Sequence, residues 1–453
     1  MTTVASTIEA TALVGTDWAA EGHAVHVMGP SGRRRDAFGI AHSRSGLEAL
    51  VKRLARFGPA AATPVAVEHP DGRLVDVLLE AGHPVVPVQP NAIKAWRDAE
   101  VLSGAKSDPG DAEVIAEHLR LRRHRLRVVQ PCSAATKALR TVVRARDDLV
   151  AQRTAARNQL EALLQATWPG AIEVFADVTS AICLDFLEKY PTWSSARLLG
   201  EKRMAPFLVK HGYSGRRPAS ELLARLRRAP DSTDDLDHAE AARDAVVGYV
   251  EVLRSLNRSI KDLDRSIAAH LGEHPDGKLF TSLPRSGHVN AAQVLAERGD
   301  PREAYDGPDA VAMLAGLAPV TKHSGKHHAV HFRWACNKRF HDAMTTFADN
   351  SRHASPWAAK ADARGRGCDH PHAVRVLARA WARVIYRCWI DATPYDANRM
   401  ATPPGSPLTK RHERNAMKRS FSDLGVDTEG VTARPLLVLG LPALGEALHG
   451  RGR

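Results

Sequence analysis

Short apolar runs alternate with amphipathic stretches over the first 130 residues of the chain. Three of these runs predict buried strands, at residues 12–16, 64–68 and 84–88. Residues 23–27 alternate between apolar and polar side chains, which predicts an antiparallel neighbour of the first strand, closed by a turn at 29–32. The intervals at 45–57 and 71–81 have helical patterns. Strands interleaved with helices around a hairpin predict an α/β layer domain with a mixed sheet over residues 10–130.

The following region, residues 131–272, has the spacing of long helices. Seven apolar residues recur at steps of three and four: Val246, Tyr249, Leu253, Leu256, Ile260, Leu263 and Ile267. This spacing is typical of a coiled-coil seam, and an ordinary helix packed in a globular core is the alternative. An earlier apolar set, which begins at Leu139, is interrupted by Arg146 and Arg153. We expect these helices to pair with each other or with another chain. The segment between them, 168–235, has no pattern that indicates a function.

The remaining chain divides into a third helical region and a tail. Residues 273–396 are predicted to be mainly helical, with loops at 283–287 and 322–326. Residues 402–407 have the Pro- and Gly-rich composition of a linker. A basic stretch follows it, at Lys410, Arg411, Arg414, Lys418 and Arg419. Residues 397–453 are therefore predicted to be a linker and basic tail appended to the core.

Four carboxylates occupy places where an α/β domain would bring them together. Asp17 and Glu68 each end a predicted strand, and Asp108 and Asp111 open a predicted helix. Carboxylates at the ends of neighbouring strands, with two more on one helical turn, are the ligands that a pair of Mg²⁺ ions needs. Two such ions hold the attacking and leaving oxygens of a phosphodiester. The set predicts an enzyme that cuts or rejoins nucleic acid.

Each of these acids also has an ordinary explanation when it is taken alone. Asp108 precedes Pro109, which suits the first position of a helix, so Asp108 is a natural N-cap and Asp111 falls at the third helical position. Asp17 by itself is more often a turn residue at the end of a strand. The metal-site hypothesis therefore depends on the whole set within one short domain.

The charge balance favours a polyanionic partner. Lys and Arg outnumber Asp and Glu by 63 to 51, and basic surface attracts phosphate, although an Arg-rich composition also occurs for reasons of genome composition. The five cysteines are scattered without a CxxC pair, which predicts a reducing cytoplasm. We find no secretory signal and no apolar stretch of membrane-spanning length, so we expect neither secretion nor membrane insertion. The group Cys368, His370 and His372 lacks the spacing of common zinc sites and is predicted to be a loop.

The order of these motifs resembles a known family. The segments 15–17 (Gly-Thr-Asp), Glu68 and 106–112 (Lys-Ser-Asp-Pro-Gly-Asp-Ala) look like the DEDD signature of the RuvC-like domain in the insertion-sequence-110 transposases. Further along, 315–319 (Ala-Gly-Leu-Ala-Pro) followed by Ser324 and Gly325 resembles the family's AGLxP…SG block. The sequence departs from the family at 69–71 (His-Pro-Asp), where the family commonly has Ala-Thr-Gly, and at Arg285 and Ser286 in a turn that is usually IPGIG-like.

The resemblance implies a mechanism and a set of partners. Ser324 would be the nucleophile that attacks DNA, whereas on sequence alone a Ser-Gly pair is simply a turn. Asp17, Glu68, Asp108 and Asp111 would hold two Mg²⁺ ions. A structured guide RNA would pair with donor and target DNA, and the protein would be a homo-oligomer, either a dimer or a tetramer. The serine loop would then act with a RuvC-like domain of its own or of another subunit.

Basic residues near these motifs are candidate phosphate contacts. Four of them belong to the dense run at 120–127 and two flank the serine: Arg122, Arg123, Arg125, Arg127, Lys322 and Lys326. A solvated helix end is the alternative for the run. Arg140, Arg144 and Arg157 continue the positive charge along the first long helix.

Three hypotheses remain open from the sequence. The first is an RNA-guided DNA recombinase that uses two metal ions and Ser324. The second is a RuvC-like junction nuclease in which the four acids direct water and Ser324 is structural. The third is a nucleic-acid-binding assembly protein with an inactive nuclease fold.

Overall fold

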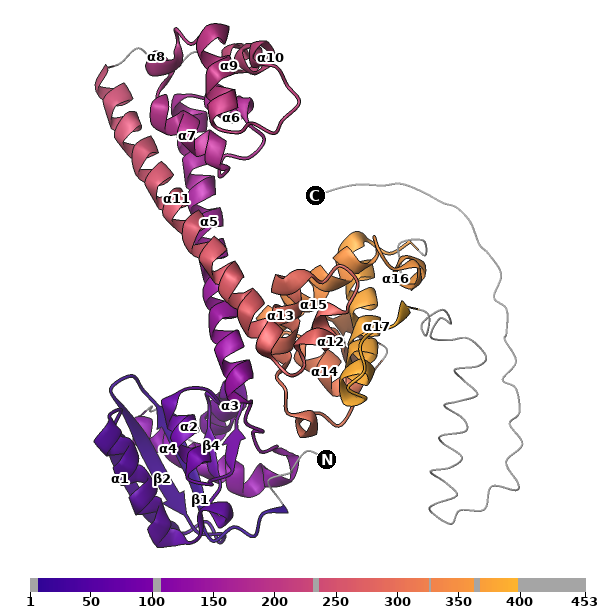
Figure 1. Cartoon of the computed structure of the whole chain (residues 1–453). Coiled ribbons are helices and arrows are strands. Elements are labelled where there is room, and N and C mark those ends of the chain that lie inside the picture. The colour runs from indigo at the N-terminus through magenta and orange to yellow at the C-terminus, as the bar shows by residue number, and fades with distance from the viewer. Residues whose placement is uncertain (1–6, 101–106, 231–235, 326, 362–366, 398–453) are drawn as a thin grey trace, which may run out of the picture. The chain divides into compact units, whose positions relative to one another are not determined.

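The N-terminal region of the chain is built on one five-stranded sheet (Figure 1). The computed structural model describes residues 7–100, 107–230, 236–325, 327–361 and 367–397. The strands follow the order β3-β2-β1-β4-β5, with bounds β1 Leu13–Trp18, β2 Gly22–Met28, β3 Arg34–Ala41, β4 Val65–Val67 and β5 Val85–Pro87. β1 is antiparallel to β2 and parallel to β4. The predicted mixed sheet is therefore confirmed.

Helices cover both faces of this sheet. On one face, α1 (Arg44–Leu54) and α2 (Arg73–Glu80) pack leucines against the valines of β1, β2 and β4. On the other face, α3 (Pro90–Glu100) and α4 (Asp108–Arg122) pack Ile93, Ile115 and Leu119 against Leu13 and Ala66. Short 3₁₀ helices connect these elements: η2 Ala55–Phe57, η3 Ala60–Ala62 and η4 Arg123–Arg125. Burial on both faces fixes the strand ends, and with them Asp17 and Glu68, between two layers of helices.

Two elements of this domain were not predicted from the sequence. β3 is an edge strand whose alternate positions are exposed and include several charged residues, so its apolar signal is weak. It pairs with β2 through the turn that was expected only to end β2. The helix α3 was also missed. The predicted strands at 12–16, 64–68 and 84–88 correspond to β1, β4 and β5.

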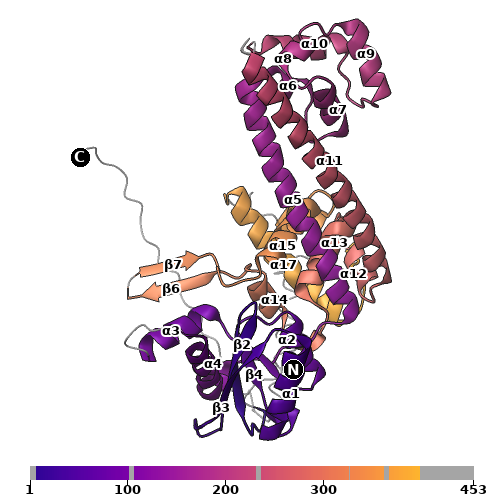
Figure 2. The same cartoon turned by 90° about the vertical axis from the view of Figure 1, so that its left-hand side faces the viewer.

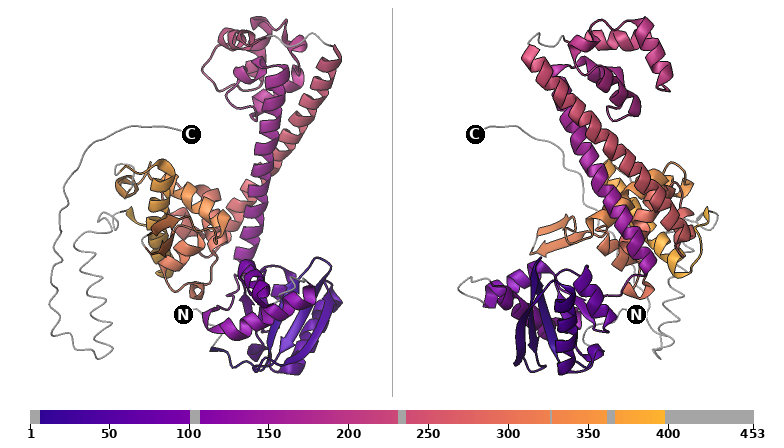
Figure 3. Two further views of the ribbon diagram at one scale, coloured as in Figure 1. Left: turned by 180° about the vertical axis from the view of Figure 1, so that it is seen from behind. Right: turned by 60° about the vertical axis from the view of Figure 1, so that its left-hand side comes forward.

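Two long helices, α5 (Ala134–Thr167) and α11 (Leu236–Glu273), lie side by side and antiparallel (Figures 1 and 3). Of the predicted seam, Val246, Leu253, Ile260 and Ile267 are buried, and the other three members are partly buried. The helices therefore pair within one chain. Whether they supercoil as a coiled coil stays a prediction.

The segment between the long helices forms a helical module around a second apolar core. Five helices make it up: α6 Gly170–Val174, α7 Ala181–Lys189, α8 Trp193–Ala196, α9 Glu201–Lys210 and α10 Ala219–Arg228. Trp168, Phe186 and Phe207 pack there against Leu160 of α5 and Val250 of α11. The segment that had no readable function is thus a helical module that shares its core with the adjoining ends of α5 and α11.

The third region is helical with one small hairpin. Its elements are α12 Gly277–Thr281, α13 Gly287–Arg298, η5 Arg302–Ala304, α14 Pro308–Leu314, β6 Val320–Ser324, β7 His327–His331, α15 Lys338–Ser351, α16 Pro356–Ala361 and α17 His370–Ile390. Their core contains Phe280, Phe340, Phe347 and Trp381, together with the ends of α5 and α11. Figure 2 shows β6 and β7 as a hairpin that projects from these helices. Within the described segments, every helix is too short or too polar to span a bilayer.

Two expectations for this region were wrong. Residues 322–326 were predicted to be a loop, but Lys322 and Ser324 lie in strand β6. The strand has no fully buried position, so it lacks the alternation that identifies strands. The segment 368–372 was also predicted to be a loop, but His370 and His372 lie in the first turn of α17, which Asp369 caps. Lys326 and residues 398–453, including the basic stretch of the predicted tail, lie outside the described residues.

Candidate active site

Asp17 and Glu68 stand at the same level of two neighbouring parallel strands. Thr16 of β1 is the register partner of Val67 of β4. Asp17 is the next residue of β1, and Glu68 directly follows the end of β4, so the two acids leave the sheet at the same level. Neighbouring strands are about 4.8 Å apart. Both side chains are partly buried, which leaves their oxygens accessible at the carboxyl ends of the strands.

Helix α4 is held against β1 by a close contact at Gly15. A Cβ atom on Gly15 would lie 2.2 Å from the carbonyl oxygen of Ala112 and 2.4 Å from the backbone nitrogen of Ala116. Only a glycine on the strand and small residues on the helix allow this approach. Asp111 immediately precedes Ala112, so the contact also fixes the N-terminal turn of α4 close to the acid-bearing end of β1.

The start of α4 differs in detail from the prediction. The N-cap is Ser107, whose hydroxyl accepts a hydrogen bond from the backbone N–H of Gly110 at 3.3 Å. Asp108 is therefore the first helical residue rather than the cap, and Asp111 is the fourth. Ser107 therefore has the capping role predicted for Asp108, while Asp108 and Asp111 remain acids of the first turn, where the helix dipole favours negative charge. Asp108 is exposed and Asp111 is buried.

A positive side chain already lies beside the acids. Arg97 of α3 donates a hydrogen bond from Nη1 to Oδ1 of Asp111 at 2.7 Å. The pKa of Arg97 is raised above its ordinary value, first by this hydrogen bond and also by the charges of Asp98 and Glu68. The guanidinium is thus within electrostatic reach of two of the four acids. Sequence reasoning missed Arg97, because it lies 14 residues from Asp111 on a different helix and belongs to no motif.

The four acids do not form a complete metal cage in this arrangement. Among the described residues, no three His, Cys, Asp or Glu side chains are grouped closely enough to hold a metal ion. Two observations nevertheless fit a hard divalent cation. The donors are all carboxylate oxygens, which Mg²⁺ prefers, and Arg97 already stands as a cation against Asp111. Asp17, Glu68, Asp108 and Asp111 are therefore the residues that would hold such an ion.

Ser324 lies in a different setting from the acids. It is the last residue of β6, opposite His327, and its side chain is exposed. Gly325 follows with a φ of 54°, a left-handed conformation that favours glycine at the tip of the hairpin. Ser286, the other serine in a family motif, is buried and donates hydrogen bonds to the carbonyls of Phe280 and Leu283, which agrees with its interpretation as a turn residue.

Of the predicted basic contacts, two are engaged with other side chains of the protein and three are at least partly exposed. Arg122 stacks over the ring of Trp96 and Arg127 pairs with Asp306 at 3.1 Å. Arg125 is exposed and Arg123 partly exposed in η4. Lys322 is exposed on the hairpin.

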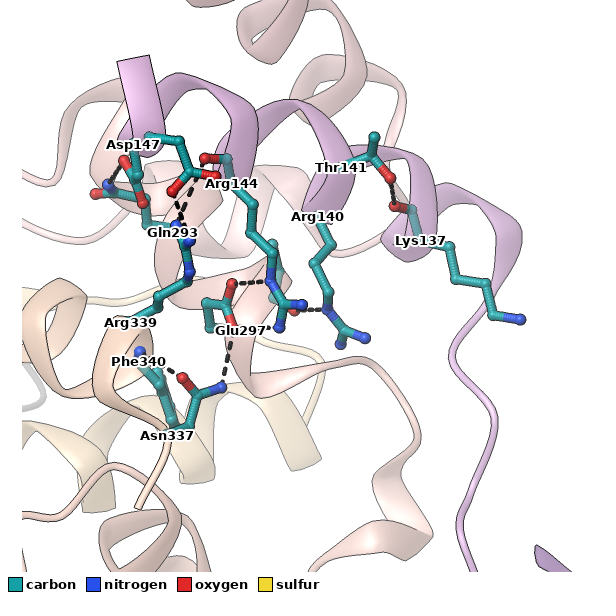
Figure 4. A network of polar contacts seen from close by, with 12 residues as sticks. Lys137, Arg140, Thr141, Arg144, Asp147, Gln293, Glu297, Asn337, Arg339 and Phe340 are labelled. Carbon is teal, nitrogen blue, oxygen red and sulfur yellow. Dashed lines mark hydrogen bonds and ion pairs between the residues drawn. The ribbon is translucent and has the colours of Figure 1, made fainter. Parts of the chain in front are cut away.

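Three arginines expected to continue a positive surface along α5 are engaged within the protein instead. Arg140 donates to the carbonyl of Ala296, and Arg144 makes a two-pronged pair with Glu297 at 2.7 and 2.9 Å (Figure 4). Arg157 pairs with Glu161 one helical turn away. Arg140 and Arg144 thereby attach α5 to α13. Their role in this structure is to join helices, which spacing along one helix does not reveal.

Two regions of the chain match models of known protein families. Residues 14–169, which contain all four acids, match a family described as transposase. Residues 277–363, which contain Ser324, match the family described as transposase IS116/IS110/IS902. The sheet domain with its acids and the helical region with its hairpin are thus parts of a transposase.

Whole-chain relatives agree with these matches. The mini-circle putative transposase for IS117 of Streptomyces coelicolor is 30% identical over 406 residues, which cover 87% of this chain and 97% of the relative. The uncharacterized 43.6 kDa protein of insertion element IS110 from the same organism is 28% identical over 85% of this chain and 95% of its own. Putative transposase y4uE of Sinorhizobium fredii is 30% identical over 44% of this chain and 56% of its own. The chain belongs to the IS110 family of transposases.

Proposed function

We propose that this transposase cuts and rejoins DNA strands by means of Asp17, Glu68, Asp108 and Asp111 in an RuvC-like domain, with Ser324 as the nucleophile and a structured RNA as the guide. The observation that carries the proposal is the placement of Asp17 and Glu68 side by side at the strand ends, next to the helix turn that bears Asp108 and Asp111. Of the four acids, Asp111 already hydrogen-bonds to Arg97, and a metal role for the set is supported by its position at the ends of two strands and the start of one helix.

Magnesium ions bound by the four acids would polarise the scissile phosphate and stabilise the charge of the leaving oxygen. Arg97 and such an ion would compete for the charge of Asp111, whose Oδ1 accepts a hydrogen bond from Arg97. The guanidinium lies beside the site, where it is suited to hold a phosphate oxygen of the DNA. The close contact at Gly15 keeps the first turn of α4, which carries Asp111, against β1.

The serine supplies a covalent route for rejoining. The hydroxyl oxygen of Ser324 forms a bond to phosphorus while the bond from phosphorus to the sugar oxygen breaks, so that the sugar oxygen leaves as a hydroxyl and the serine gives up its proton. The resulting phosphodiester between serine and DNA conserves the energy of the broken bond, and a second sugar hydroxyl reverses the step without ATP. The exposed position of Ser324 on a projecting hairpin suits a group that must reach DNA.

Two partners complete the proposal. The guide RNA would be recognised through its shape and backbone, which is consistent with exposed basic residues such as Arg125 and with the absence of any base-reading motif in the sequence. Homo-oligomers would let the hairpin of one subunit serve the acids of another, because Ser324 and the acids belong to separate regions of the polypeptide.

The decisive experiment is to trap the covalent adduct. We expect wild-type protein, incubated with Mg²⁺, guide RNA and labelled DNA, to give a protein–DNA adduct on a denaturing gel. Ser324→Ala removes the attacking oxygen and should abolish the adduct, whereas Thr321→Ala, an exposed change on the same strand, should preserve it. Asp17→Asn should also abolish it while leaving DNA binding intact.

The outcomes separate the three hypotheses. DNA cleavage by Ser324→Ala without an adduct would support water as the nucleophile, as in the second hypothesis. Unchanged strand exchange by Asp17→Asn would indicate a binding protein in which the acids have no catalytic role.

A further inference from the structure

A groove of about 650 Å³ lies between the foot of the β6–β7 hairpin and helix α17. Val330, His331 and Phe332 line it on the hairpin side, and the loop before β6 contributes Leu317 and Pro319. The side chains of Arg375, Arg379 and Arg383 line it on the helix side. We call this feature the arginine groove. None of the site residues predicted from the sequence lines it.

The three arginines form one row because they are spaced by four residues on α17. Side chains at this spacing lie above one another on a helix. The other face of α17 faces the core, where Leu377, Trp381 and Ile385 are buried. The helix therefore presents a row of guanidinium groups toward the groove, on a rigid support.

The positive charge of the row exceeds what the protein itself neutralises. Arg379 and Arg383 share one carboxylate, that of Asp309, each at 3.6 Å, which is too long for a good hydrogen bond. Within the described part of the chain, no carboxylate lies within ion-pair distance of Arg375, and the buried Nε of Arg379 has no hydrogen-bond partner. The groove therefore has unused donors and about two uncompensated charges.

An aromatic surface lies at the same foot of the hairpin. Trp334 is 77% exposed, and its ring meets that of Phe332 edge-on at 5.4 Å. The ammonium group of Lys338 lies 4.5 Å from the centre of each ring. A basic groove with an exposed aromatic ring nearby, here Trp334, is the arrangement by which proteins hold single-stranded nucleic acid, with phosphates on the cations and bases on the ring.

The groove is also close to Ser324 along the hairpin. Val330, which lines the groove, pairs with Thr321, and Ser324 is three residues further along β6. At about 3.3 Å per residue this is roughly 10 Å. We propose that the arginine groove binds the backbone of one DNA strand and leads its phosphates to Ser324. This inference rests on the proposed function, in which Ser324 attacks that strand.

The proposal is tested by the salt dependence of DNA binding. The probe is a fluorescent DNA single strand of mixed sequence, about 16 nucleotides long, and binding is followed by anisotropy between about 50 and 200 mM salt. Each phosphate contact contributes about 0.7 to the slope of log affinity against log salt. We expect the triple variant R375Q/R379Q/R383Q to lose roughly two units of slope and at least about tenfold in affinity. An unchanged slope would overturn the proposal.

A neighbouring arginine provides the matched control. Arg387 follows Arg383 by one turn of α17 and has its own carboxylate partner, Asp391 at 2.6 Å, but it does not line the groove. We expect Arg383→Gln to lower the slope and Arg387→Gln to leave it unchanged. Equal losses of slope in Arg383→Gln and Arg387→Gln would show a general effect of charge and would refute the proposal that the groove binds DNA.

Asp309→Asn separates a binding role from a structural one. If the arginines serve DNA, removing their shared carboxylate frees two of them, and the single strand should bind several-fold more tightly. If they serve only to attach α14 to α17, the variant should melt at a lower temperature and bind no better, which would count against the proposal. An RNA strand of the same sequence is run in parallel, and a loss confined to RNA would also overturn it.

The tests distinguish this inference from the proposed function. If the groove variants bind DNA normally and still form the Ser324 adduct, DNA binding by the arginine groove is refuted while the serine mechanism is retained. If they lose DNA binding but wild-type protein forms no adduct, the groove is a DNA site and the serine mechanism fails. Ser324→Ala should bind the probe as well as wild-type protein does.

Discussion

The acids and the serine are held in opposite ways. Asp17 and Glu68 end strands of a sheet that is covered on both faces by helices, and the helix that carries Asp111 touches β1 backbone to backbone. Ser324 ends a two-stranded hairpin with no fully buried residue in β6. An isolated hairpin of two strands is marginal in water. The positions of the acids are therefore fixed by packing within the sheet domain, whereas we expect the position of Ser324 to depend on the nucleic acid that the hairpin contacts.

This difference matches the chemistry proposed for each. Metal ligands must keep their geometry to within a fraction of an ångström, so they belong on well-packed elements. A nucleophile that has to meet DNA, and then release it to another strand, gains from a support that can move.

The largest effect is expected at Gly15. A side chain in Gly15→Val would meet the backbone of α4, which cannot move aside without separating helix and strand, so we expect a loss of at least about 3 kcal/mol in the stability of the sheet domain. A Cβ atom at Gly325, on the hairpin tip, would meet no atom within 4 Å. Gly325→Ala should therefore cost only about 1 kcal/mol, through its left-handed backbone. The two stability losses are measured by hydrogen exchange, of the β1 amides for Gly15→Val and of the β6 amides for Gly325→Ala.

A helical glycine with open space around it provides a control for the cost of an added Cβ atom. Gly248 lies exposed on α11, and a Cβ atom there would also have no neighbour within 4 Å. Gly248→Ala should stabilise the helix by up to about 1 kcal/mol. If Gly15→Val lowered stability no more than Gly325→Ala does, the close contact at Gly15 would not be what fixes the acids.

An intermediate effect is expected at Glu297, which supports the region that carries the hairpin. Burial would raise the pKa of Glu297, but hydrogen bonds from Arg144 and Asn337 lower it below its ordinary value of 4.5. A lowered pKa means that the carboxylate stabilises the fold above pH 4.5 and that this stability is lost as the pH falls through the folded-state pKa. Glu297→Gln should cost about 2 kcal/mol at neutral pH, since Arg144 is then left without its partner.

The measurement for Glu297 is the melting temperature as a function of pH. The difference between wild type and Glu297→Gln should be constant above about pH 5 and should shrink below pH 4.5. Arg157→Gln, which breaks an exposed pair with Glu161, should change stability by less than about 0.5 kcal/mol. A difference that grows toward acid would contradict the assignment of Glu297 as an ionised, stabilising group.

The smallest effect concerns Arg97 and the metal. Because its guanidinium competes for Asp111, Arg97→Gln should bind Mg²⁺ or Mn²⁺ roughly tenfold more tightly, a change of about 1.4 kcal/mol. Calorimetric titration of the purified protein measures this without reference to activity. Arg122→Gln, on the same side of the domain but stacked on Trp96, is the control. Weaker metal binding in Arg97→Gln would show that the arginine organises the acids rather than competing with a metal.

Sequence patterns predicted the buried strands, including the edge strand β5, but not the exposed strands β3 and β6. β1 and β4 are buried on both faces, so they appear as continuous apolar runs, and the acids that end them were visible for the same reason. β3 and β6 are exposed, and an exposed strand has little hydrophobic pattern to detect. The Arg97–Asp111 pair could not be predicted from the sequence, because it depends on how α3 and α4 pack. The arginine row on α17 was not singled out from the sequence, because a spacing of four residues does not show that the side chains line a groove.

The two long helices have a further consequence for motion. Arg146 and Arg153, which interrupt the apolar pattern of α5, reach across to Asp264 at 2.6 Å and Asn257 at 3.4 Å of α11. Apolar cores hold the pair on either side of this polar stretch. Polar contacts can exchange with water at little cost, whereas apolar cores cannot be opened cheaply. The centre of the helix pair, where Ile260 is buried among these polar contacts, is therefore held less by apolar packing than either end, and we expect bending to cost less there than at either core.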